Sequence, residues 1–212
     1  MKRLAAPGVL LLAAACASGP VPPDWQLEAH GALESYKAAY LKGDAKSAAL
    51  EFARARRELA STGRAERVAQ AELTRCALAT ASLEFDDCPG FVPLAADAGP
   101  AARAYAAYLA GRWDGVDAAL LPVAQRAVVA GGKAAPIEEP LSRLVAAGVL
   151  FRMQRVEPPD IAAAIEVASA QGWRRPLLAW LGVEERRAQA AGDAEAAARF
   201  RRRIELILEG KR

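Results

Sequence analysis

Three cysteines, at positions 16, 76 and 88, carry the chemistry that this 212-residue sequence indicates most clearly. The first of them, Cys16, follows the basic residues Lys2 and Arg3 and an apolar run over positions 4–15. A basic start followed by a short apolar run is typical of a secretory signal peptide, and the run falls short of the ~20 residues that a membrane-spanning helix needs. The sequence therefore predicts an exported protein.

The residues directly before Cys16 resemble a bacterial lipobox. Leu12-Ala13-Ala14-Ala15-Cys16 places small residues before the cysteine, although Ala13 stands where leucine is commoner. In lipoproteins with this motif the thiol receives a diacylglycerol, the leader is cleaved and the new amino terminus is acylated; several acyl chains, at ~0.8 kcal/mol per buried methylene, form a stable anchor. The resemblance implies a signal peptide over residues 1–15 and a lipid on Cys16. An ordinary cleaved leader is the alternative.

A short tether is expected over residues 16–24, with prolines at positions 20, 22 and 23. Prolines favour the extended polyproline II conformation, so at ~3.1 Å per residue the tether keeps the following domain within ~25 Å of the membrane. Ala17, rather than aspartate, follows the cysteine. By analogy with lipoprotein sorting in enteric bacteria, this favours the outer membrane, facing the periplasm, over the inner membrane.

Cys76 and Cys88 remain as a pair, twelve positions apart. In an oxidising compartment such a pair is expected to form a disulfide. Residues 86–90, Asp-Asp-Cys-Pro-Gly, have the composition of a turn that folds the chain back onto the preceding helix. Two buried free thiols are one alternative, and a metal-binding pair, which would need further ligands, is another.

Few residues offer a basis for catalysis. His30 is the only histidine, which excludes His-based triads and zinc sites built on several histidines. Glu34-Ser35 resembles the catalytic dipeptide of lytic transglycosylases, in which the glutamate is a general acid and needs a shielded site. The Gly-Leu-Met-Gln stretch expected downstream in that family is absent. Since no glycine-rich phosphate loop is present either, we predict no catalytic residue, no cofactor and no metal.

The charge balance of the mature chain is close to neutral. The full sequence carries a formal charge of +3, and loss of Lys2 and Arg3 leaves 26 basic against 25 acidic residues. Such a chain has no general attraction to nucleic acid, and we predict no nucleic-acid partner. Trp173, Arg174 and Arg175 form the cluster most typical of a partner-binding surface, because tryptophan and arginine are enriched at interface hot spots.

Helical periodicity appears almost everywhere after Pro23, apart from an expected loop over residues 86–100, and the sustained alternation typical of strands is absent from the domain at residues 25–212. The sequence therefore predicts one all-α domain, with Asp24 capping its first helix and Pro122 kinking or splitting another. The expected helices cover residues 25–42, 45–61, 65–84, 101–110, 113–130, 138–155, 158–170, 176–191 and 194–209.

Paired helices joined by short turns prompt a search for repeats. Residues 40–44, Tyr-Leu-Lys-Gly-Asp, followed by Ala48, Phe52 and Ala55, resemble the turn and second helix of a tetratricopeptide repeat. Weaker copies occur around Gly111 and Gly192. Gly43 and Gly111 are 68 positions apart, twice that family's 34-residue period, whereas Gly111 and Gly192 are 81 apart, which is off period, and the best copy lacks the signature tryptophan and the Leu-Gly pair of the first helix. The resemblance implies a stack of antiparallel helical hairpins, a divergent solenoid; an irregular helical bundle is the alternative.

The sequence therefore predicts a membrane-anchored envelope lipoprotein that acts as a non-enzymatic scaffold for a protein or peptide. The prediction combines the expected location, the expected helical fold and the lack of a catalytic constellation. Helical repeat stacks form concave surfaces suited to such binding. The alternative is an enzyme that acts on peptidoglycan, or an accessory to one. A groove lined by tyrosine, tryptophan and arginine favours the first function, and a deep pocket around Glu34 favours the second.

Overall fold

The computed structural model describes residues 22–210, and along this stretch the regular structure is entirely helical. The predicted all-α fold class is therefore confirmed. The helices are α1 (Asp24–Lys42), α2 (Ala45–Ala60), α3 (Ala65–Ala81), α4 (Pro100–Leu109), α5 (Val123–Gly131), α6 (Pro140–Arg152), α7 (Pro158–Ala170), α8 (Arg174–Ala190) and α9 (Ala194–Glu209), with short 3-10 turns η1 (Val92–Leu94) and η2 (Ala118–Leu120).

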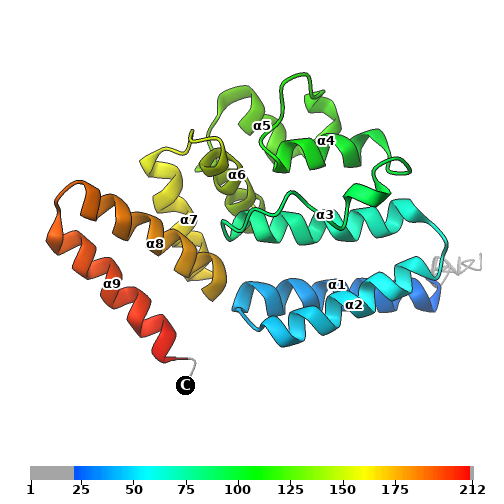
Figure 1. Cartoon of the computed structure of the whole chain (residues 1–212), viewed down its shortest axis with the longest axis horizontal. Helices are drawn as coiled ribbons and strands as arrows, with labels where there is room; N and C mark the ends of the chain where they lie inside the picture. The colour runs from blue at the N-terminus through cyan, green and yellow to red at the C-terminus, as the bar shows by residue number, and fades with distance from the viewer. Residues whose placement is uncertain (1–21, 211–212) are drawn as a thin grey trace, which may run out of the picture.

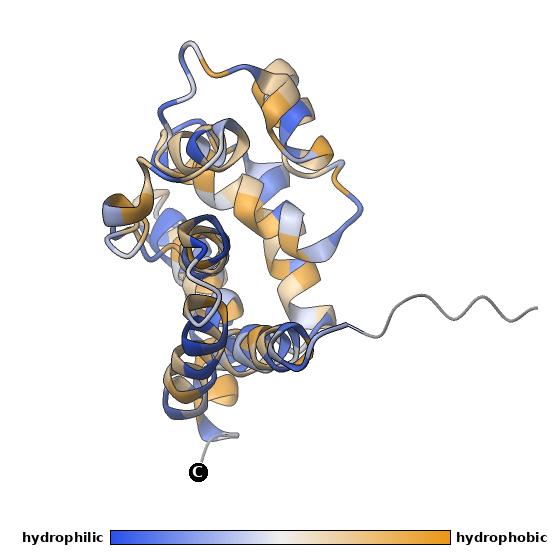
Figure 2. Cartoon of the chain, turned by 90° about the vertical axis from the view of Figure 1, so that its right-hand side faces the viewer, coloured by the Kyte–Doolittle hydropathy of each residue, from blue (hydrophilic) through white to orange (hydrophobic). Residues whose placement is uncertain are grey.

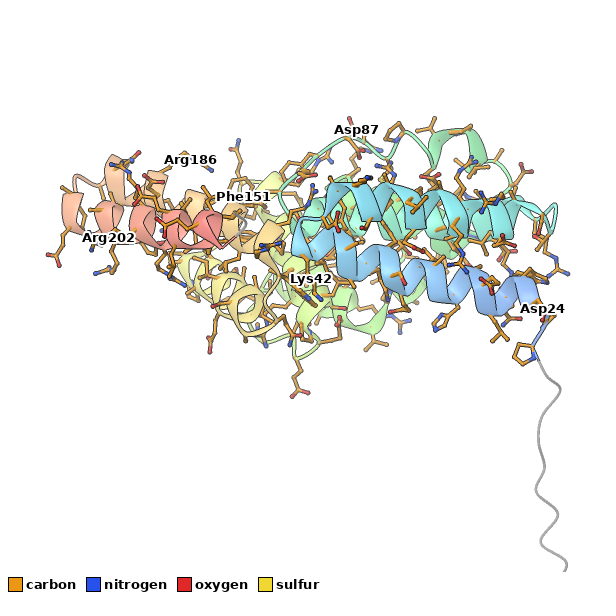
Figure 3. All side chains as sticks on the ribbon, turned by 90° about the horizontal axis from the view of Figure 1, so that it is seen from below. Asp24, Lys42, Asp87, Phe151, Arg186 and Arg202 are labelled. Carbon is orange, nitrogen blue, oxygen red and sulfur yellow. A yellow bond between two sulfur atoms is a disulfide. The ribbon has the colours of Figure 1, made fainter. Side chains whose placement is uncertain are left out.

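The molecule is elongated, with a helical hairpin at each end of its lower side (Figure 1). The α1–α2 hairpin forms one end and the α8–α9 hairpin the other, while α3 lies above the α1–α2 hairpin, α6 lies near the centre beside α3, and α4 and α5 cover the top. Asp24 and Arg202 accordingly lie at opposite ends of the long axis, with Lys42 between them (Figure 3). Because the start of α8 contacts the end of α1, the two hairpins meet near the middle of the molecule.

The centre of the core is the crossing of α3 and α6. Nearly every residue in the second half of α3 is buried, and so are residues 144–150 of α6. At the crossing, a Cβ on Gly148 would lie only 2.8 Å from the carbonyl carbon of Thr80. Such an overlap is far inside van der Waals contact, so only glycine lets the two backbones approach this closely.

The helices that can be followed in Figure 2 carry both hydrophilic and hydrophobic residues. This pattern is typical of helices that bury one face against a core and leave the other in water. Within the described part of the chain, none of the helices has the length and apolar character needed to cross a membrane.

Two helix boundaries show the capping chemistry that glycine and aspartate favour. Gly43 ends α1 in the left-handed conformation, at a φ of 78°, and the Asp44 carboxylate accepts a hydrogen bond from the Ser47 amide at the start of α2. Asp193 caps α9 in the same way through the Ala196 amide. The prediction for Asp24 was wrong by one position, because Asp24 is the first helical residue and Pro23 occupies the cap. There its negative charge still favours the helix N-terminus.

The helix expected over residues 113–130 is wrong in its first half. Residues 113–122 form an irregular connection that contains η2, and the helix begins only at Val123. Gly115 adopts a φ of 77° and Pro122 lacks the amide hydrogen that a continuous helix would need, so the chain breaks rather than kinks. The expected helix over residues 65–84 likewise stops at Ala81, because Leu83 turns into the left-handed conformation at a φ of 59°.

Candidate binding site

The most distinctive hollow of the molecule lies where its two halves meet. It has a volume of about 390 Å³ and is bordered by α1, α2 and α3, by the loop that follows α3, and by the start of α8. We call it the junction pocket. Its lining residues are Tyr36, Tyr40, Ala45, Ala48, Ala49, Phe52, Arg75, Ala79, Glu84, Phe85, Asp86 and Arg175.

Aromatic rings from the first hairpin form one side of the junction pocket. Tyr36 and Tyr40 lie one helical turn apart on α1, which places them on the same face, and their ring centroids are 5.8 Å apart. Phe52 reaches Tyr36 from α2, with 4.9 Å between the ring centroids. The small side chains of Ala45, Ala48 and Ala49 lie beside these rings and leave the space open.

Arg175 forms the polar side of the pocket together with Glu84. Its Nε donates to the carbonyl oxygen of Tyr40 at 3.1 Å, its Nη1 donates to Glu84 Oε1 at 2.9 Å, and its guanidinium lies over the Tyr40 ring, 4.2 Å from the centroid. Burial opposes the charge, but the hydrogen bond to Glu84 and the negative charge of that residue hold the pKa of Arg175 above its usual value. The network joins α8 to α1 across more than 130 positions of sequence.

Arg75 holds the loop after α3 in place. Its Nη1 donates to Asp86 Oδ2 at 2.8 Å, and its Nε donates to Glu72 Oε2 at 3.2 Å. Glu72 is itself buried, and its other oxygen accepts from Arg56 Nε at 3.0 Å. Partial burial opposes ionisation of Asp86, yet the hydrogen bond from Arg75 and the amide of Cys88 lower its pKa below the usual value. The carboxylates near the pocket are therefore already paired with arginine side chains.

The Tyr36 hydroxyl differs from the other polar groups of the pocket. The side chain is only 3% exposed, and its hydroxyl has no hydrogen-bond partner among the described residues. The hydroxyl oxygen itself nevertheless keeps some contact with solvent. Since Tyr36 lines the junction pocket, the exposed part of its hydroxyl faces that open space.

Cys76 and Cys88 are joined by a disulfide, in agreement with the predicted pairing. Their Cα atoms lie 5.5 Å apart, within the range that a disulfide spans. The bond pins the loop that carries Glu84, Phe85 and Asp86 against α3. Of the alternatives, free thiols do not agree with this bond, and sulfurs bonded to each other offer no thiolate to a metal even though Asp86 lies close to both.

The predicted partner-binding cluster lies beside the junction pocket, and one of its three residues lines it. Arg175 belongs to the pocket, whereas Arg174 donates from its Nε to the carbonyl oxygen of Lys42 at 3.0 Å. Arg174 and Arg175 also border a smaller neighbouring hollow of about 200 Å³. Trp173 is half-buried and packs against the core.

The other residues considered from the sequence fall elsewhere. Glu34 is exposed on α1, with 52% of its side chain accessible, and pairs with Lys37 at 2.6 Å. His30 is also exposed on α1. The lipidation site Cys16 lies outside the described residues.

A larger hollow of about 790 Å³ lies between α7, α8 and α9. Its wall includes Ile165 and Phe200, and two of its charged residues, Glu184 and Arg187, pair with each other. It contains no buried polar side chain that lacks a partner. The junction pocket, in contrast, is lined by a buried tyrosine whose hydroxyl, unpartnered among the described residues, opens into it, and we therefore consider it the better candidate site.

Sequence reasoning did not identify Tyr36, Arg75, Glu84 or Phe85 as site residues. The spacing of Tyr36 and Tyr40 was a usable signal, because it places two aromatic residues on one helical face. The rest of the pocket comes from a loop and from α8, which nothing in the local sequence connects to α1. In comparisons with known proteins, no family model, no curated protein and no solved structure matches this chain.

Proposed function

We propose that this protein is a lipid-anchored envelope lipoprotein that binds another protein or a peptide without catalysing a reaction, and that the junction pocket is its binding site. The observation that carries the proposal is the pocket itself, a hollow lined by two tyrosines, two phenylalanines and two arginines. Tyrosine and arginine are among the residues most enriched at binding hot spots. The volume of about 390 Å³ suits one large side chain or a short segment of a partner.

The location rests on the sequence of the leader. The lipobox-like residues before Cys16 support a lipid anchor, and Ala17 favours the outer membrane, facing the periplasm. The disulfide between Cys76 and Cys88 is consistent with an oxidising compartment.

The proposed architecture is a divergent stack of tetratricopeptide-like hairpins that is interrupted in its middle. Two features support it: Ala48 and Ala55 are buried where α2 packs on α1, and Ala197 is buried where α9 packs on α8. The environment of Glu34 gives no support to the alternative of a peptidoglycan-acting enzyme, because a general acid needs shielding from water and this side chain is exposed.

Replacing Cys16 with serine is expected to release the protein from the membrane or to leave it as an uncleaved precursor. The reason is that serine offers no thiol for the diacylglycerol. Membrane fractionation and the mass of the mature chain measure both effects, with Cys88→Ser as the control that removes a cysteine without touching the anchor. A Cys16→Ser protein that is processed and fractionates like the parent would contradict the lipoprotein assignment.

A photo-crosslinking side chain at Phe85 is expected to capture the partner in intact envelopes. Phe85 suits this test because it lines the pocket, is 38% exposed and is already aromatic, so that benzoylphenylalanine keeps its ring and adds a benzoyl group. Val123, an exposed apolar residue of α5 outside the pocket, is the control position.

A second substitution, which fills the pocket with a large side chain, tests whether the crosslinked adduct depends on an open pocket. Ala49→Trp places a large ring in the pocket from an exposed position of α2, and it is expected to abolish the adduct. Leu50→Trp is the matched control, since Leu50 is the next residue, is 69% exposed and does not line the pocket. An adduct that survives Ala49→Trp, or the absence of any protein adduct at Phe85, would refute binding at this site.

A further inference from the structure

The acceptors of the junction pocket already have hydrogen-bond partners, whereas some of its donors have none among the described residues. This difference indicates what kind of ligand fits the pocket. Each oxygen of the two pocket carboxylates already accepts one hydrogen bond. Glu84 Oε1 accepts from Arg175 and its Oε2 accepts from the Tyr40 hydroxyl at 2.8 Å, while Asp86 Oδ2 accepts from Arg75 and its Oδ1 accepts from the Cys88 amide at 3.1 Å. A ligand that enters the pocket therefore finds no unoccupied carboxylate to which it could donate.

Hydrogen-bond donors remain available. The Tyr36 hydroxyl donates to no described residue, and the Nη2 of Arg175 has no acceptor there either, because the contacts of that guanidinium use its Nε and Nη1. The Tyr36 hydroxyl reaches the open space of the pocket, where a ligand could accept from it, and hydrogen bonds from a charged donor such as Arg175 to an anion are roughly twice as strong as neutral ones. The pocket is thus organised to satisfy a hydrogen-bond acceptor.

The electrostatic environment of the Tyr36 hydroxyl favours an acceptor that is negatively charged. Burial raises the pKa of Tyr36, but among the neighbouring charges Arg75 and Arg175, which lower it, act more strongly than Glu72 and Glu84, which raise it. Together, these four charges therefore make the electrostatic potential at the hydroxyl positive. Both arginine side chains are less than a quarter exposed, so water screens this potential only in part.

The remaining walls are apolar. Phe52, Phe85 and the alanines of α2 lie around the donors, so the part of a ligand next to its anionic group would be covered by rings and methyl groups. Such walls favour an aliphatic or aromatic body and disfavour a compact, strongly hydrated anion such as phosphate.

We propose that the junction pocket binds a carboxylate carried on an apolar or aromatic body, with the Tyr36 hydroxyl and Arg175 Nη2 donating to the carboxylate and the rings of Phe52 and Phe85 covering the body. The inference rests on the proposed binding function of the same pocket and narrows it. The carboxyl-terminal residue of a peptide has this chemistry and is the occupant that we propose. A fatty acid shares the chemistry, and the test distinguishes the two.

The experiment titrates small probes into the full-length mature lipoprotein in detergent and measures binding by calorimetry. N-acetylphenylalanine represents a peptide carboxyl terminus, octanoate represents a fatty acid, and N-acetylphenylalaninamide lacks the charge. We expect a carboxylate probe to bind at least tenfold more tightly than the amide, and the tighter of the two carboxylates identifies the source. Equal affinity of the acid and the amide, or no binding of either carboxylate, would overturn the inference.

Removing the Tyr36 hydroxyl distinguishes the proposed binding role of this residue from a purely structural one. Tyr36→Phe keeps the ring and its packing, so the protein is expected to melt as the parent does while the carboxylate probe binds about tenfold more weakly and any binding of the amide is unchanged. Tyr105→Phe is the matched control, because the Tyr105 hydroxyl also lacks a protein partner but lies on α4, outside the pocket.

An unchanged affinity of Tyr36→Phe for the carboxylate would refute the assigned role. The two proposals fail separately. If crosslinking at Phe85 captures a partner through an internal segment without a carboxylate, the ligand class is wrong and the binding function stands.

Discussion

Replacing Trp180 with alanine is expected to lower the free energy of unfolding by about 3–5 kcal/mol, the usual cost of emptying a large aromatic site in a core. The side chain is 0% exposed and packs edge-on against Phe151 of α6, with 5.8 Å between the ring centroids. Its indole Nε1 also donates to the carbonyl oxygen of Ala81 at 3.1 Å, at the end of α3. Alanine therefore leaves both a cavity and a buried carbonyl without its donor.

The loss is large against the 5–15 kcal/mol that stabilises most domains, because Trp180 joins α8 to the two central helices. Urea unfolding followed by circular dichroism measures it. Trp180→Phe keeps most of the volume and isolates the hydrogen bond, worth about 1 kcal/mol. Trp25→Ala, at a half-buried tryptophan near the start of α1, is the control for loss of a ring alone. Equal losses for Trp25→Ala and Trp180→Ala would show that Trp180 does not hold the halves together.

Removing the disulfide, in a Cys76→Ser/Cys88→Ser variant, is expected to cost about 3 kcal/mol. The bond closes a loop with a sequence separation of 12, and the entropy that such a short loop loses in the unfolded chain corresponds to roughly that figure. Chemical unfolding of the oxidised parent and of the variant measures the difference. A reductant should lower the stability of the parent and leave that of the variant unchanged.

Thiol labelling provides the control for this experiment. Denatured, unreduced mature parent should show no free thiol at Cys76 or Cys88, and reduction should expose two. Two reactive thiols before reduction would contradict the bond. The variant should also weaken binding in the junction pocket, because the released loop carries Glu84 and Asp86, which hold Arg175 and Arg75. Stability and binding are thus coupled through one short loop.

The elements of this fold were predictable where a residue acts on its own backbone. Gly43 and Asp44 separate α1 from α2 by local conformation and capping, and Asp193 does the same before α9. The pairing of Cys76 with Cys88 follows from a turn between residues that are close in the chain. These features involve neighbours within about a dozen positions, so the sequence order already brings the partners near one another.

The sequence was less informative for residues 113–122, where apolar residues at helical spacing do not form a helix. The long connection between α3 and α6 is held instead by a buried network in which the Tyr108 hydroxyl donates to Gln125 Oε1 at 2.6 Å and Gln125 Nε2 donates to the carbonyl oxygen of Ser142 at 3.2 Å. Those partners become neighbours only after α4, α5 and α6 have packed, and packing then outweighs local helical propensity.

By itself, the sequence determined the all-helical class, the boundaries set by glycine and aspartate, and the disulfide, because each depends on local conformation or on short loops. The junction pocket was decided only by the tertiary structure. Its aromatic side comes from α1 and α2, whereas Arg175 reaches it from α8, more than 130 positions later. The close crossing of α3 and α6 at Gly148 and the burial of Trp180 bring these segments together, and no periodicity in a single helix encodes which distant helix it will meet.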